Sequence, residues 1–194
     1  PRYTHIWDVN IVLKLLRSMF PLSSLCLKNL TLKLVMLLSL ITAQRAQTIH
    51  LLNVGNIVFE NNRAILLIGD LLKTSSPRNK PPIIVLDKYP EESLCVFTTL
   101  KFYLEKTKDL RKCKELFITY QKPHRAASKG TISRWIKSVI AKSGIDVRTF
   151  KAHSTRSASC AAAKRASMSA ADIIESAGWN NAKTFERFYD KEII

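Results

Sequence analysis

Apolar residues recur at helical spacing through the first part of the chain. In residues 8–19 they fall on one face, and Pro21 ends the pattern. In residues 27–40 they form a broader stripe, which is typical of a helix that packs inside a domain. We therefore expect a docking helix and then a buried helix, whose far end leads into Thr42-Ala43-Gln44-Arg45.

The middle of the chain changes to short runs of β-branched and apolar residues. Residues 57–59 and 64–68 form two such runs, and Asn61 and Asn62 between them suit a turn. A third run at residues 83–86 follows an irregular segment that is rich in proline and polar residues. This pattern predicts a hairpin and a third strand in one small sheet.

Helical spacing returns in the second half, interrupted by a short extended segment at residues 116–119. We expect Gly144 to end one amphipathic helix and Ser154 or Thr155 to cap the next. Ser169 and Asp172 resemble the start of another helix. The predicted helices cover residues 91–109, 131–142, 154–166, 170–177 and a short stretch from residue 181. The predicted fold class is mixed, mainly α-helical with a small antiparallel β-sheet.

The length of 194 residues fits one domain, on which residues 1–21 would pack as an N-terminal helix. The most apolar stretch, residues 30–41, contains Lys33 and is shorter than the roughly 20 residues that a bilayer span needs. The first residues lack the layout of a secretory signal. We therefore expect an intracellular protein that does not bind membranes.

The net charge indicates what kind of partner the protein binds. The chain has 31 Lys and Arg and 15 Asp and Glu, which gives a formal net charge of +16. Between Arg111 and Arg165 there are 14 basic residues, and the only acids are Glu115 and Asp146. Such an excess favours a polyanionic partner, above all the phosphates of nucleic acid. An anionic lipid surface is the alternative that charge alone leaves open.

Cysteine spacing argues against two kinds of site. The four cysteines lie far apart in the chain, with no Cys-x-x-Cys pair and no nearby histidine pattern: Cys26, Cys95, Cys113 and Cys160. Neither a zinc site nor a disulfide framework is expected from this spacing.

Six residues, taken in chain order, carry a resemblance to a known family. They are Arg45, Lys73 beside the hairpin, His153 and Arg156 in His-Ser-Thr-Arg, Trp179 after a glycine, and Tyr189 in Phe-Tyr-Asp. This order resembles the Arg, Lys, His-x-x-Arg, His/Trp, Tyr signature of the tyrosine recombinases, the phage-integrase-like superfamily. Residues 153–161 and 177–191 are most similar to recombinases of eukaryotic mobile elements of the DIRS, Ngaro and Crypton kind. Taken singly, each residue has an ordinary explanation as a surface cation or a core aromatic.

The resemblance implies site-specific DNA recombination or integration by the tyrosine recombinase catalytic fold. Tyr189 would attack a phosphodiester and form a 3′-phosphotyrosine. Arg45 and Arg156 would meet the negative charge that grows on the phosphate, since a guanidinium stays protonated and can bind two oxygens at once. His153 would relay the tyrosine proton near neutral pH.

The other implied roles fall on the loop after the hairpin and on the C-terminal region. Lys73 would protonate the departing 5′ oxygen, with Lys80 as the alternative general acid. Trp179 would donate its indole N–H to a phosphate oxygen while its ring packs below the site. Further DNA contacts are expected from five basic residues: Arg78, Lys80, Arg134, Lys137 and Lys151. Neither a metal nor a cofactor is required, because Arg, Lys and His supply the charge and protons.

The resemblance also sets expectations about partners and completeness. Double-stranded DNA would be the substrate, a homotetramer the working assembly on DNA, and the nucleus the compartment. The separate N-terminal clamp domain of the family is absent from these residues, and Thr48 stands where relatives often have an acid. Two alternatives stay open: a catalytically inactive DNA-binding module derived from a mobile element, and a type IB topoisomerase-like enzyme.

Overall fold

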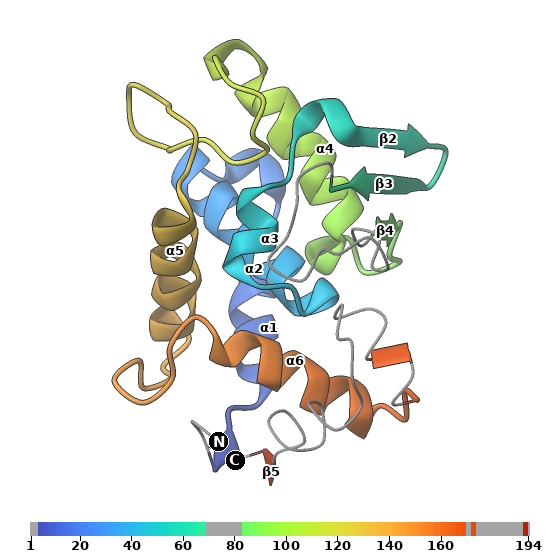
Figure 1. The fold of residues 1–194 in the computed structure, drawn as a ribbon, viewed down its shortest axis with the longest axis vertical. Helices are drawn as coiled ribbons and strands as arrows, with labels where there is room; N and C mark the ends of the chain where they lie inside the picture. The colour runs from blue at the N-terminus through green and yellow to red at the C-terminus, as the bar shows by residue number, and fades with distance from the viewer. Residues whose placement is uncertain (1–3, 69–82, 170–171, 174–191, 194) are drawn as a thin grey trace, which may run out of the picture.

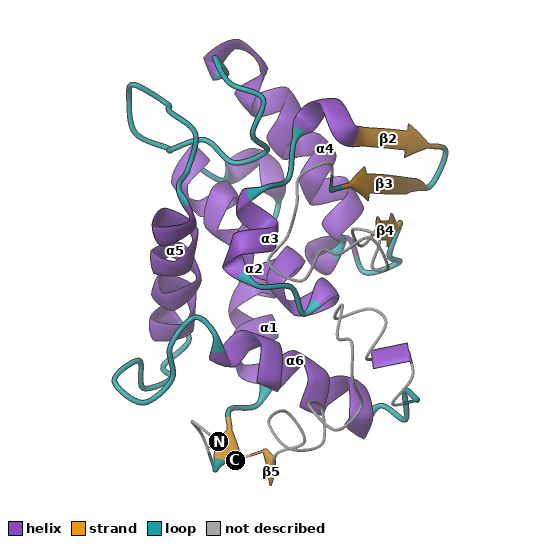
Figure 2. Cartoon of the chain, viewed as in Figure 1, coloured by secondary structure: helices purple, strands orange, loops and turns teal. Residues whose placement is uncertain are grey.

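A computed structural model of the chain describes residues 4–68, 83–169, 172–173 and 192–193. Helices make up most of this part, and a small antiparallel sheet lies at one side (Figures 1 and 2). The predicted fold class is confirmed. None of the helices in these ranges combines the length and the apolar character that a bilayer span needs.

Helix α2 (Leu27–Thr42) lies at the centre of the molecule (Figure 1). Every residue from Leu30 to Leu40 is buried, because α4 (Val96–Thr107), α5 (Lys129–Lys142) and α6 (Ser154–Arg165) all pack against it. Both predicted N-terminal helices are confirmed. The first is α1 (Val9–Ser18), where the Asp8 carboxylate accepts the Asn10 N–H at 2.9 Å.

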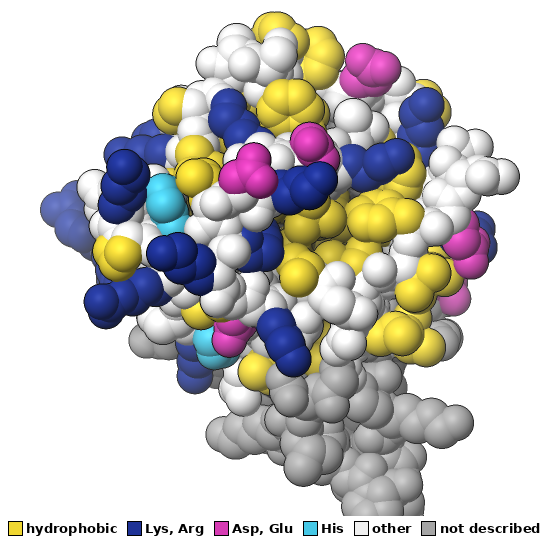
Figure 3. All heavy atoms as spheres, turned by 90° about the horizontal axis from the view of Figure 1, so that it is seen from above, with side chains coloured by type: hydrophobic (Ala, Val, Ile, Leu, Met, Phe, Trp, Pro, Cys, Tyr) yellow, Lys and Arg dark blue, Asp and Glu magenta, His cyan; other side chains and the backbone are white. Residues whose placement is uncertain are grey.

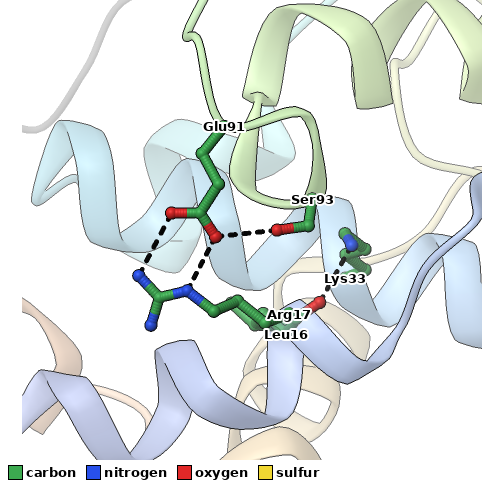
Figure 4. Close-up of polar contacts among 5 residues, drawn as sticks. All are labelled: Leu16, Arg17, Lys33, Glu91 and Ser93. Atoms are coloured by element: carbon green, nitrogen blue, oxygen red, sulfur yellow. Dashed lines mark hydrogen bonds and ion pairs between the residues drawn. The ribbon is translucent and has the colours of Figure 1, made fainter.

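A buried lysine ties α1 to α2. Lys33 has no exposed surface, and its ammonium donates to the carbonyls of Leu16 at 2.9 Å and Met19 at 2.6 Å, at the end of α1. Burial lowers the pKa of Lys33 to about 8. On the surface nearby, the Arg17 guanidinium binds Glu91 at 2.7 Å, and Glu91 also accepts the Ser93 hydroxyl (Figure 4).

The sheet has the order β2 (Ile57–Glu60), β3 (Arg63–Leu67), β4 (Ile83–Asp87), with both pairs antiparallel. Four alternate residues of β3 and β4 are buried: Ala64, Leu66, Ile84 and Leu86. The residues between them face outwards, which is the period of two expected of a half-covered sheet. The predicted hairpin and third strand are therefore confirmed.

Two predicted segments of the second half differ in detail. The helix expected at 91–109 is divided into a 3₁₀ turn (Glu92–Leu94) and α4, because Cys95 is extended and its Sγ accepts the Thr98 N–H at 3.4 Å. The extended segment at 116–119 is confirmed by a bridge between Ile118 and Ala126. Helix α5 ends as predicted, since Gly144 has a φ of 86°.

The predicted cap of α6 is wrong. Ser154 and Thr155 lie inside the first turn, and His153 takes the N-cap position without a side-chain capping bond. The Ser154 hydroxyl has other partners: it donates to the Lys151 carbonyl at 2.7 Å and accepts the Trp7 indole N–H at 2.9 Å. The Ser154 hydroxyl therefore accepts the Trp7 N–H from the other end of the chain, and it does not accept a backbone N–H of the first turn of α6, as a capping residue would.

Both described ends of the chain lie beside α6. Strand β1 (His5–Ile6) pairs in parallel with β5 (Glu192–Ile193), and both contact α6 (Figure 1). The predicted pair of Ser169 and Asp172 is confirmed, with the Asp172 N–H donating to the Ser169 hydroxyl at 3.1 Å. The helices expected at 170–177 and from 181 fall almost entirely outside the described residues.

Candidate active site

The end of α2 builds one wall of the candidate site. Ala43 has a φ of 48°, in the left-handed region that a residue with a side chain seldom adopts. The Thr42 hydroxyl holds the turn, because it donates to Leu38 O at 2.6 Å and accepts the Gln44 N–H at 3.2 Å. This turn makes Arg45 the N-cap residue of α3 (Ala46–His50), a short helix that the sequence pattern did not predict.

Arg156 joins this turn to α6. It is 3 % exposed, and its Nη1 donates to the carbonyl of Ala43 at 2.8 Å, across 113 positions of sequence. A guanidinium keeps its proton even when buried, so the bond places a fixed positive charge here. Burial raises the pKa of the Cys160 thiol, one turn further along α6, to about 12, and the charge of Arg156 opposes part of that rise.

A pocket of about 250 Å³ lies between the start of α3, the start of α5 and the start of α6. Four nitrogen-bearing basic side chains line it: Arg45, Lys129, His153 and Arg156. Uncharged polar residues complete much of the wall, among them Gln44, Gln47, Ser133 and Thr155. Since no described lining residue is acidic, the pocket is suited to an anion.

The pocket brings together three of the six residues in the recombinase signature. Arg45 and His153 are exposed at its rim, and Arg156 is buried in its wall. Lys73, Trp179 and Tyr189 lie outside the described residues. The catalytic role of each residue stays a prediction.

The expected DNA contacts lie elsewhere. Arg134 and Lys137 are exposed on α5, and Lys151 is half-buried, with its ammonium donating to Val147 O at 3.1 Å. None of these three lines the pocket. Figure 3 shows Lys and Arg side chains gathered on the side of the molecule where α5 lies. Arg78 and Lys80 fall outside the described residues.

Sequence reasoning missed several residues of the pocket. Lys129 was overlooked because α5 begins two residues before the predicted start, where the Ser128 hydroxyl accepts the Thr131 N–H at 3.2 Å. Gln44 and Thr155 adjoin predicted site residues in the sequence, which is the one local signal that marked them. Within the described ranges, no three His, Cys, Asp or Glu side chains gather where they could share a metal ion.

Several solved structures that match this fold are recombinases. XerH site-specific recombinase bound to difH substrate matches with a TM-score of 0.70 and 16% identity, over 95% of this chain and 49% of that one. XerA recombinase matches with a TM-score of 0.69 and 16% identity, over 98% of this chain and 60% of that one. The lambda integrase catalytic core matches with a TM-score of 0.51 and 19% identity, over 98% of both chains.

The share of the matched chains that is covered and the matching family model give two further findings. The chain spans about half the length of the XerH recombinase that it matches, 49%, and nearly all of the lambda integrase catalytic core, 98%. No curated protein sequence matches it significantly. The family model described as the phage integrase family matches residues 20–192, nearly the whole sequence. The chain therefore belongs to the phage integrase family.

Proposed function

We propose that the chain cleaves and rejoins DNA strands through a 3′-phosphotyrosine on Tyr189, in site-specific recombination or integration. The observation that carries the proposal is the shared pocket of Arg45, His153 and Arg156, which brings the N-cap of α3 to the start of α6, a segment far away in the sequence. None of the described lining residues is acidic, so the positive charge of the two arginines is not neutralised within the described wall. Membership of the phage integrase family supports the same conclusion.

In this proposal the two arginines hold the scissile phosphate. Charge grows on the non-bridging oxygens when a phenol attacks, and fixed guanidinium groups stabilise it without reorganising. The bond from Arg156 to the Ala43 carbonyl orients one guanidinium before DNA arrives. His153, exposed at the rim, exchanges the proton of the attacking phenol.

The remaining roles rest on the family signature. Tyr189 is the nucleophile, Lys73 the general acid for the 5′ oxygen with Lys80 as the alternative, and Trp179 a donor to the phosphate. No metal ion takes part in this scheme.

We also propose the partners and origin of the protein. Double-stranded DNA is the substrate, and a homotetramer is the assembly on DNA, as in the lambda integrase tetramer bound to a Holliday junction. Arg78, Lys80, Arg134, Lys137 and Lys151 contact phosphates outside the pocket. The similarity of the sequence of residues 153–161 to recombinases of eukaryotic mobile elements supports an origin in elements of the DIRS, Ngaro or Crypton kind, acting in the nucleus.

A covalent-trapping experiment tests the proposal. The protein is incubated with nicked suicide duplexes that carry a randomised core, and denaturing gels then separate any protein–DNA adduct. We expect wild type to form an adduct at Tyr189, and Tyr189→Phe to bind DNA but form none, because only the attacking oxygen is removed. Adduct formation by Tyr189→Phe would assign another nucleophile. Relaxation of supercoiled plasmid without strand exchange would favour the topoisomerase-like alternative.

A DNA-binding module without turnover is the second candidate function. The observation that favours it is charge, since 31 Lys and Arg against 15 Asp and Glu suit binding to phosphates whether or not a strand is cleaved. Binding through phosphates alone would weaken steeply between 50 and 200 mM salt, by roughly 10³-fold or more if six or more phosphates are contacted. Salt-sensitive binding with no adduct from wild type would place this function first.

A further inference from the structure

Two neighbouring hydroxyl groups at the start of α6 differ in what they bind. The Ser154 hydroxyl donates to Lys151 O at 2.7 Å and accepts the Trp7 indole N–H at 2.9 Å. Thr155 is just as deeply buried, with 2 % of its surface exposed, yet its Oγ1 has no hydrogen-bond partner among the described residues. The Ser154 hydroxyl thus has two hydrogen-bond partners within the fold, and the Thr155 hydroxyl has none among the described residues.

An unused buried hydroxyl calls for an explanation. Burying a polar group without a partner destabilises a protein, and most such groups in native structures are paired. Helical threonines ordinarily donate to the carbonyl four residues earlier, as Thr99 does to Cys95 at 2.7 Å. For Thr155 that residue is Lys151, whose carbonyl already accepts both the hydroxyl and the N–H of Ser154. The usual local partner is therefore occupied.

The pocket offers the other partner. Thr155 lines it together with Arg45 and Arg156. A helical threonine has two accessible χ1 rotamers, so rotation about Cα–Cβ exchanges the positions of hydroxyl and methyl at small cost. A ligand oxygen in the pocket then becomes an acceptor for the hydroxyl. The guanidinium groups beside it favour an oxyanion as that ligand.

We propose that the Thr155 hydroxyl donates a hydrogen bond to a non-bridging oxygen of a phosphate held in the pocket by Arg45 and Arg156. The inference deepens the proposed function and rests on it, since it adds a phosphate-binding residue to the same site. The arginines supply charge, and the hydroxyl supplies a short, directional donor that fixes one oxygen. Thr155 is thus a binding residue that lies inside the His-Ser-Thr-Arg segment.

Three variants of the full chain test this. Thr155→Val replaces the hydroxyl with a methyl group of similar size, and Thr155→Ser keeps the hydroxyl. Thr99→Val is the matched control, because Thr99 is a fully buried helical threonine on α4, and it is not among the lining residues of the pocket. Thermal denaturation is measured for each with and without inorganic phosphate.

We expect Thr155→Val to melt at or above the wild-type temperature without phosphate, because the substitution removes an unpaired buried hydroxyl. Phosphate should stabilise wild type, Thr155→Ser and Thr99→Val alike, and bind Thr155→Val about three- to tenfold more weakly. The opposite pattern, a lower melting temperature with undiminished phosphate binding, would mean that the hydroxyl serves the fold, and it would overturn the inference.

Suicide-substrate cleavage by the same variants separates this inference from the proposed function. Cleavage by Thr155→Val should be about three- to tenfold slower than by wild type, with Thr155→Ser restored to the wild-type rate. If wild type forms an adduct and Thr155→Val matches it in rate and in phosphate affinity, the inference fails and the proposed function stands. If wild type forms no adduct while phosphate binding still depends on the Thr155 hydroxyl, the proposed function fails and the phosphate site stands.

Discussion

Lys33 on α2 and Arg156 on α6 are two buried cations in very different surroundings. The ammonium of Lys33 is enclosed at the end of α1, with two carbonyl acceptors and the Phe20 ring at 5.9 Å. Arg156 donates to the carbonyl of Ala43 and lines a pocket of about 250 Å³ beside Arg45 and His153. The first cation closes a helix end, and the second lies in the wall of a pocket.

The comparison teaches that burial of a charge does not by itself mark a functional site. Burial lowers the pKa of Lys33 to about 8, so this side chain can lose its proton at moderately alkaline pH. A guanidinium does not lose its proton in that range, and it can bind two phosphate oxygens. What distinguishes the two regions is therefore the kind of cation and the pocket next to Arg156, whose described lining holds no acidic residue.

Among substitutions that keep or remove one contact, a large effect should come from changing the kind of cation at the pocket. Arg156→Lys keeps the charge but loses the planar fork, so we expect DNA cleavage to fall by about 100-fold, while DNA affinity falls far less. Single-turnover cleavage of a suicide substrate and a binding titration at one salt concentration measure the two quantities. Equal cleavage rates for Arg156→Lys and wild type would show that only the charge matters here.

At Lys33 we expect an effect on stability that depends on pH. The pKa in the folded state, about 8, is below the ordinary value of 10.5, so the unfolded chain holds this proton more tightly. As pH rises from 8 to 10.5 the folded state loses the proton first, and the free energy of unfolding should gain about 3 kcal/mol from this residue.

A comparison with Lys33→Met isolates the part of the free energy of unfolding that Lys33 adds as pH rises. The free energy of unfolding of wild type should rise, relative to Lys33→Met, when urea unfolding at pH 7 is compared with unfolding at pH 10. Other groups that titrate in this range are common to both proteins and cancel in the difference. A constant difference between the two proteins across this range would show that the environment of Lys33 does not depress its pKa.

A smaller loss of stability should follow when the link between α6 and the N-terminal segment is cut. Ser154→Ala removes the acceptor of the Trp7 indole N–H, a buried hydrogen bond of 2.9 Å. We expect a cost of about 1–2 kcal/mol in the free energy of unfolding, since a buried donor is left without its partner. Denaturant titration checks this, and Thr155→Val, one residue along, is the contrasting control with no expected loss.

The smallest effect should be that of the surface ion pair near Lys33. Arg17 and Glu91 are bonded at 2.7 Å, but their side chains are 47% and 37% exposed. Water and salt screen such a pair, so Arg17→Ala should change the melting temperature by no more than about 2 °C. The change should shrink further in 1 M NaCl. A large loss that persists in high salt would mean that Arg17 contributes by packing.

Most of the helices and strands could be predicted because their apolar residues repeat at a regular period. Helix α3, with five residues, is too short to show one. Lys33 could be recognised only as an interruption in an apolar stretch, since its acceptors lie 17 and 14 positions away on another element. The cap of α6 was mispredicted because the Trp7 indole, 147 positions away, binds the Ser154 hydroxyl.

Arg45, His153 and Arg156 could be named as candidate site residues because the order of residue types resembles a family signature, and their catalytic roles stay predictions. Their place in one pocket depends on tertiary packing, which local patterns do not encode. The same limit explains why Lys129 was missed: it reaches the pocket from the start of α5, a third segment of the chain. The one sequence signal for Thr155 is its position next to Arg156, and only the structure shows that its hydroxyl has no hydrogen-bond partner among the described residues.

The most direct test of the account measures DNA cleavage by two variants side by side, Arg156→Ala and Lys33→Met, each shown to be folded by circular dichroism at pH 7. If the pocket holds the scissile phosphate and Lys33 only closes α1, Arg156→Ala should lose about 10²- to 10³-fold in single-turnover cleavage rate, and Lys33→Met should stay within about threefold of wild type. Cleavage by Arg156→Ala at the wild-type rate, or an equal loss in both folded variants, would contradict the distinction between the two buried cations.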